Sequence, residues 1–181
     1  GIFDVYEDNA EDVSEYWVNV EADDGYDASN SDGNLDAITY DVWVSPTGSD
    51  DASVTGVESD PFKTINYAFS RIYATEDDPV TINLTGGTET NPDIFSPSIT
   101  GESFPIIMIS NVNLIGQGED VTILDAAQTS QVIKMSYCQN NIISLLTITG
   151  GKEIDGIGTY HGGGGMELRN SHPILSNLKI I

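Results

Sequence analysis

The residues best suited to metal chemistry are aspartates near the N-terminus, in the stretch EADDGYDASNSDGNLD. Carboxylate oxygens are the ligands that Ca²⁺ prefers in proteins. The stretch does not fit the twelve-residue calcium loop, because placing Gly33 at the invariant glycine puts Ala28 at the first ligand position. The density of ligands supports the hypothesis of an irregular calcium site formed by Asp23, Asp24, Asp27 and Asp32. A solvated acidic surface is the favoured interpretation of such a charge run, and the calcium site is the alternative.

A second group of candidate ligands lies in the glycine-rich stretch GGKEIDGIGTYHGGGG. Glu153, Asp155 and His161 combine carboxylate and imidazole, which suits zinc or a similar ion. Spacing carries little information in so glycine-rich a segment, so an ordinary surface loop is the favoured interpretation. The sequence offers no Ser-His-Asp arrangement, phosphate loop or cysteine cluster. We therefore predict no catalytic residue and no cofactor-binding residue, and we assign Cys138 to the core or to a turn.

The overall charge narrows the range of partners. The chain of 181 residues has 29 acidic and 6 basic side chains, a formal net charge of −23. Seventeen of the acids precede Lys63, which is the first basic residue. Nucleic acid is an unsuitable partner, because phosphate binding needs clustered Lys and Arg. No apolar run approaches the roughly 20 residues of a membrane span.

The elements that must position any site begin with a short strand and a helix. Val42 to Val44 are predicted as a strand, and the turn-rich stretch SPTGSDDAS follows them. Asp60 is then expected to cap a helix that has Pro61 in its first turn. A stripe of apolar residues at spacings of three and four continues this pattern from Phe62 to Ile72. The pattern predicts a short amphipathic helix that covers a hydrophobic surface.

Beyond this helix the sequence changes to short apolar strands separated by Gly, Asn and Asp. The runs are VTINL, PIIMIS, VNLIG, VTILD, VIKMS, NIISLLTIT, GMELR and PILSNLKII. The segment Ile142 to Ile148 aligns with Ile174 to Ile180 at an offset of 32. Ile133 to Ser136 aligns with Met166 to Arg169 at an offset of 33. A nearly constant offset over two strand pairs indicates stacked coils.

Four pieces of the chain, in order, resemble the right-handed parallel β-helix superfamily, the pectin-lyase-like fold, and its secreted bacterial members in particular. The pieces are WVSPTGSDD, DPFKTINYAF, NVNLIGQGEDVTILD and GGGGMELRNSHPILSNLKI, and the resemblance covers about residues 42–181. It implies an all-β fold, a right-handed parallel β-helix with an N-terminal capping α-helix. The same fold carries lyases, hydrolases and adhesins, so the resemblance alone does not identify an activity.

The resemblance also implies where chemistry would be sought. β-Helix lyases use a basic residue on an outer face, and the basic residues on the predicted strands are Lys134, Arg169 and Lys179. Lys134 and Arg169 fall in aligned segments and are expected to lie near each other in adjacent coils. A solenoid presents a few such charges in any case, so a structural role is favoured. We expect Asp120 and Asp125 to serve turns, and Asn140 and Asn141 to form a ladder at a turn.

The sequence divides into an acidic N-terminal extension, residues 1–41, and a β-helix domain, residues 42–181. In that domain residues 42–79 form the N-terminal cap and residues 80–181 the coils, which we expect to be incomplete at the C-terminus. The chain stops on the apolar strand ILSNLKII. An uncapped coil would expose backbone groups and apolar side chains. Such an edge is expected to be covered by further coils or, head to tail, by the strand-like part of another copy's arm around Tyr16 to Val20.

Three functions remain open at this point. The preferred one is a secreted or cell-surface β-helix with a structural or adhesive role, self-assembling or bound to surface polysaccharide. The first alternative is part of a carbohydrate-active enzyme, a polysaccharide lyase in preference to a hydrolase. The second alternative is a glycan-binding module without turnover, although the strands carry few aromatic residues that could form a sugar platform.

Overall fold

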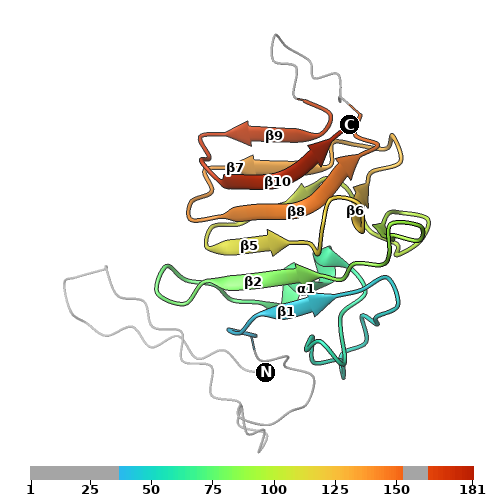
Figure 1. Ribbon diagram of the computed structural model, residues 1–181. Helices are drawn as coiled ribbons and strands as arrows, with labels where there is room; N and C mark the ends of the chain where they lie inside the picture. The colour runs from blue at the N-terminus through green and yellow to red at the C-terminus, as the bar shows by residue number, and fades with distance from the viewer. Residues whose placement is uncertain (1–36, 153–162) are drawn as a thin grey trace, which may run out of the picture. The chain divides into compact units, whose positions relative to one another are not determined.

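The computed structural model describes residues 37–152 and 163–181, and all structural statements below concern these residues. They contain ten strands and one short helix, in the order shown in Figure 1. The strands are β1 (Val42–Val44), β2 (Val80–Leu84), β3 (Asp93–Phe95), β4 (Ile106–Ile107), β5 (Val112–Ile115), β6 (Thr122–Asp125), β7 (Ile133–Ser136), β8 (Ile142–Thr149), β9 (Met166–Arg169) and β10 (Ile174–Ile180). The helix α1 spans Ile65–Arg71.

Every pairing between these strands is parallel, as predicted. Figure 1 shows β1, β2, β5, β8 and β10 stacked one above the other. A second stack contains β3, β6 and the C-terminal half of β8, and a third contains β4, β7 and β9. The chain therefore visits the stacks in turn and returns to the first one a level higher, an arrangement compatible with a parallel β-helix.

The register agrees with the two sequence alignments. Ile174 of β10 lies opposite Ile142 of β8, and the pairing continues in step to Ile180 and Ile148. Met166 of β9 likewise lies opposite Ile133 of β7. The offsets of 32 and 33 residues seen in the sequence are thus the lengths of one circuit of the chain. An antiparallel sandwich or barrel is excluded for these strands.

β8 and β10 each serve two stacks because both bend in the middle. Leu145 of β8 has a φ of 59° and Asn177 of β10 a φ of 49°, and the two residues occupy matching positions. A positive φ turns the strand sharply at that point. The first half of β8 pairs with β5 and the second half with β6. Asn tolerates this conformation better than Leu, whose strain is carried by the packing on either side.

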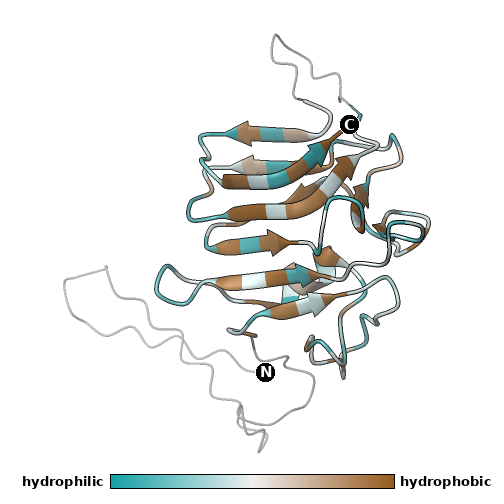
Figure 2. Cartoon of the chain, viewed as in Figure 1, coloured by the Kyte–Doolittle hydropathy of each residue, from teal (hydrophilic) through white to brown (hydrophobic). Residues whose placement is uncertain are grey.

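The core consists of rows of aliphatic side chains that run from one level of the stack to the next. One row contains Val42, Ile82, Leu114 and Ile143, which are in register and fully buried. The strand neighbours of these residues point outward, so apolar and more polar residues alternate along β2 in Figure 2. Burial of such rows provides the main stabilisation of the fold, because each fully buried aliphatic side chain contributes about 1.5–3 kcal/mol.

The helix starts later than predicted. Its N-cap is Thr64, whose side chain accepts a hydrogen bond from the backbone N–H of Tyr67. Asp60 instead binds the backbone and hydroxyl of Thr55 at 2.9 and 3.0 Å, which stabilises the preceding loop. Phe62 is extended and forms a parallel bridge with Val44. Of the predicted apolar stripe, Phe62, Ile65 and Ile72 are buried in the same core as β1, and Phe69 is partly buried against it. Ala68, which was not part of the predicted stripe, is buried there as well.

The predicted inward positions are correct for β8 and only partly buried in β10. Leu146 and Ile148 are fully buried, whereas Leu178 is half-buried and Ile180 is 53% exposed. The difference follows from position, because β8 is covered by strands on both levels and β10 pairs with β8 alone among the described residues. Ile180 continues the inward row of Ile148 but has no further level above it here.

The turn before β8 contains the predicted asparagine ladder. The Asn140 side chain donates to the Asn111 side-chain oxygen at 3.0 Å, one level below. Asn141 is buried and its amide donates to the carbonyls of Ile109 and Val112, both at 2.7 Å. These bonds join the turn to residues of the level below. Residues 37–152 and 163–181 contain no helix that is long and apolar enough to cross a membrane.

Candidate functional site

A shallow groove of about 280 Å³ lies on the outer face of the second stack, where β6, β8 and β10 run side by side. Its floor is a row of outward residues in register: Ile123, Thr147 and Lys179. Two loops form its walls, one between β2 and β3 and one between β5 and β6. The lining residues are Glu89, Pro92, Glu119, Asp120, Ile123, Thr147, Thr149, Lys179 and Ile181.

The loop between β5 and β6 is held against the sheet by two local features. The Thr147 hydroxyl donates to the Glu119 carbonyl at 2.5 Å, which fixes the loop over the strand. Gly116 is the first residue of this loop and lies close to β8. A Cβ atom at this position would lie 2.1 Å from the Leu145 carbonyl oxygen. Only glycine permits this approach. The wall that carries Glu119 and Asp120 therefore has a defined position.

The groove is negatively charged. Three carboxylates, those of Glu89, Glu119 and Asp120, line it together with the single ammonium of Lys179. Lys179 Nζ lies 3.7 Å from Asp120 Oδ1, and both side chains are substantially exposed. Such an exposed pair contributes at most about 1 kcal/mol and can open readily. Carboxylates, a hydroxyl from Thr149 and apolar floor residues make the surface suited to polar ligands that are neutral or positively charged.

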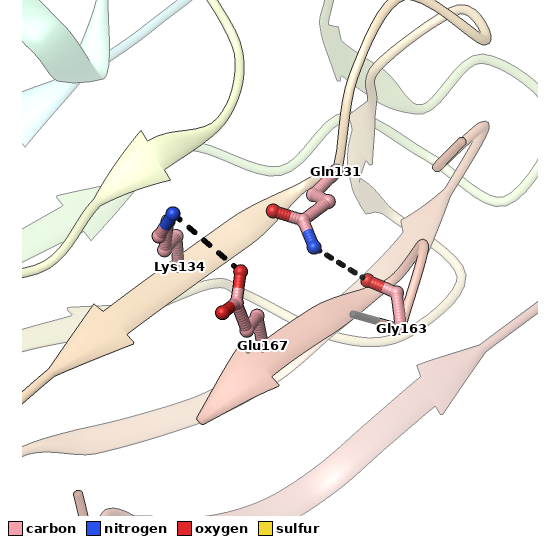
Figure 3. A network of polar contacts seen from close by, with 4 residues as sticks. All are labelled: Gln131, Lys134, Gly163 and Glu167. Atoms are coloured by element: carbon pink, nitrogen blue, oxygen red, sulfur yellow. Dashed lines mark hydrogen bonds and ion pairs between the residues drawn. The ribbon is translucent and has the colours of Figure 1, made fainter. Parts of the chain in front are cut away.

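A second polar cluster lies on the outer face of the third stack, between β7 and β9 (Figure 3). Lys134 Nζ lies 3.6 Å from Glu167 Oε2, and the Gln131 amide donates to the Gly163 carbonyl at 3.3 Å. Each contact joins successive levels of the stack. Lys134 and Arg169 were expected to be neighbours, and they do lie on adjacent strands. The residue opposite Lys134 is however Glu167, whereas Arg169 lies opposite Ser136.

Among the residues that the structure describes, Glu102, on the segment between β3 and β4, has a buried carboxylate, and this residue was not predicted as a site from the sequence. It is 2% exposed and accepts from the backbone of Ile65 at 2.6 Å and from the backbone and side chain of Asn66 at 3.1 and 2.6 Å. Asp50 accepts from the adjoining backbone of Lys63 and Thr64 at 2.8 and 3.1 Å. Glu102 thus satisfies the first two free N–H groups of α1, and Asp50 satisfies those of the two residues before the helix.

The surroundings of Glu102 change its titration. Burial raises the pKa of this carboxyl above its ordinary value of 4.5, and the nearby charge of Asp50 acts in the same direction. The hydrogen bonds from Ile65 and Asn66 act the opposite way, but they do not outweigh burial. The network is nevertheless structural in character, because its donors are the helix N-terminus and one amide.

Of the other residues considered in the sequence, some lie in turns, in the core or in the groove, and the rest lie outside the described residues. Asp125 accepts from the Ala127 backbone at 2.8 Å, which is the predicted turn role, whereas Asp120 lines the groove. Cys138 is buried, with its sulfur 3.1 Å from the Met108 carbonyl oxygen. The described part of the chain contains no group of three or more His, Cys, Asp or Glu side chains arranged for a metal.

Both predicted metal sites fall in segments that the structure does not describe. The candidate calcium ligands are in residues 1–36 and the candidate zinc ligands in residues 153–162. The calcium ligands are Asp23, Asp24, Asp27 and Asp32, and the zinc ligands are Glu153, Asp155 and His161. These two hypotheses therefore stay predictions.

Comparison with protein families matches part of the chain. A family model described as a protein of unknown function (DUF1565) matches residues 47–126. The matched segment runs from the loop after β1 to the residue after β6, and the family is one associated with parallel β-helices. No curated protein and no solved structure is significantly similar to the chain. The match supports the parallel strand architecture and leaves the activity open.

Proposed function

We propose that the chain is a right-handed parallel β-helix of the pectin-lyase-like type that acts as a structural or adhesive protein, secreted or at the cell surface. The observation that carries this proposal is the unbroken parallel register from β1 to β10. Such a stack presents rows of outward side chains on a rigid frame, which suits extended binding surfaces.

The outward lysines support a structural role. Lys134 lies beside Glu167 on the next level, and Lys179 lies beside Asp120 on the groove wall. A lyase needs a basic group directed at its substrate, yet both ammonium groups here face carboxylates of their own chain. This arrangement favours their use in joining levels and loops over their use in proton abstraction.

Surface polysaccharide is the partner that we propose for the adhesive role, with the groove on β6, β8 and β10 as its contact. The floor of Ile123 and the wall residue Pro92 offer apolar contacts for the faces of sugar rings, and Thr149 and the carboxylates offer hydrogen bonds. The negative charge of the groove favours neutral or amino sugars over uronates, because like charges repel. The groove is therefore also the place where the lyase alternative would have to act.

One experiment separates the adhesive proposal from the enzymatic alternative. The purified chain is run by affinity electrophoresis through gels that contain neutral, amino-sugar or uronate polysaccharides, and the same polymers are incubated with it and monitored for unsaturated products. We expect retardation by a neutral or amino-sugar polymer, weakened in the double variant Glu119→Gln/Asp120→Asn and retained in the control Asp77→Asn. Release of unsaturated product would support the lyase alternative, and migration unaffected by every polymer would contradict polysaccharide binding.

Self-association is the second partner proposal. Ile174, Leu175 and Ile180 of β10 are between 42% and 63% exposed, and β10 pairs with β8 alone among the described residues. An exposed apolar strand edge is a template for pairing with another strand. We expect the 181-residue chain to sediment as a species larger than a monomer, and a version that lacks residues 1–41 to shift towards monomer if the arm supplies that strand. Monomers in both cases would contradict the proposal.

A further inference from the structure

We draw no further inference here: the strongest candidate, the groove on the outer face of β6, β8 and β10, belongs to the site already described, and beyond its acidic side chains nothing in the described residues points to a particular ligand.

Discussion

Replacement of Glu102 tests how the segment between β3 and β4 stabilises the start of the stack. In Glu102→Ala the backbone N–H groups of Ile65 and Asn66 lose their acceptors, and the side-chain amide of Asn66 loses one of its two. Loss of a helix cap costs about 0.5–2 kcal/mol, and a buried donor left without a partner costs about 1–3 kcal/mol. Removing a buried charge near Asp50 offsets part of this cost, because both burial and Asp50 disfavour the ionised form.

The expected net loss for Glu102→Ala is about 1–3 kcal/mol in the free energy of unfolding, since one cap with two backbone donors is removed and a desolvation penalty is relieved. The measurement is urea-induced unfolding at neutral pH, followed by circular dichroism. Glu76→Gln, at an exposed position, serves as the control and is expected to unfold at the same urea concentration as the unmodified chain. If Glu102→Ala unfolds there as well, the cap does not stabilise the fold as argued.

The pH dependence of the same residue gives a second readout with a definite sign. The pKa of Glu102 is raised in the folded chain, so between 4.5 and that raised pKa the folded state binds more protons than the unfolded state. The contribution of this group to stability is therefore fully present below pH 4.5 and is lost as the pH rises through the folded pKa. Glu102→Gln cannot titrate and should lack this component. An unchanged difference in stability between Glu102→Gln and the unmodified chain across that range would refute the assignment.

Three further outcomes are expected. Leu146→Ala should cost about 2–5 kcal/mol because the side chain is fully buried, whereas Leu178→Ala, half-buried at the matching position of β10, should cost clearly less in the same urea titration. Lys134→Ala should change the unfolding free energy by less than about 1 kcal/mol, because its pair with Glu167 is partly exposed; a larger loss would give the pair a greater role. Calcium titration of thermal stability should show an effect that disappears when residues 1–41 are removed, and an equal gain in both versions would contradict a site in the arm.

The parallel register could be predicted because it is written in repeated residues. β8 and β10 keep Ser144 and Ser176, and Leu146 and Leu178, at the same offset of 32, so the alignment gives the pairing directly. Residues that face a shared interior have the same neighbours in every circuit, and this restricts them to similar side chains. The pairing of β10 with β8, and its register, could therefore be predicted from the sequence.

The start of the helix was harder to predict because two cap signatures compete within five residues. Asp60 followed by Pro61 is a favourable beginning, and Thr64 is another. The structure uses Thr64 because Phe62 is needed in extended conformation beside Val44, where it is fully buried. Burial of a phenylalanine side chain outweighs the preference of a cap, which is about 1 kcal/mol.

The Glu102 cap and the groove could not have been found by reading along the chain. Glu102 accepts hydrogen bonds from residues 36 and 37 positions earlier in the chain. These donors lie at the start of the helix, which does not belong to the repeating strands, so the repeat gave no indication of the contact. The groove floor joins Ile123 to Thr147 at an offset of 24, shorter than the offset of 32 between Thr147 and Lys179. Because the circuits differ in length, a search of the sequence for repeats at one constant offset does not align the residues of this row.

The offsets of 24 and 32 residues differ because the loops between the strands differ in length. The loops on the outer face also carry the charged residues of the groove. The circuit that links β6 to β8 is short, whereas the loop between β5 and β6 bulges over the outer face and is fixed there by Thr147 and Gly116. Inward rows are filled by apolar side chains in register, such as Phe95, Leu124 and Ile148, so variation in circuit length is accommodated in outer loops. The circuit from Thr147 to Lys179 is longer because of residues 150–165 between β8 and β9, whereas Glu89, Glu119 and Asp120 lie on the separate loops between β2 and β3 and between β5 and β6. The stack therefore fixes the frame, while the charge of the binding surface is set by loops that can change without disturbing the core.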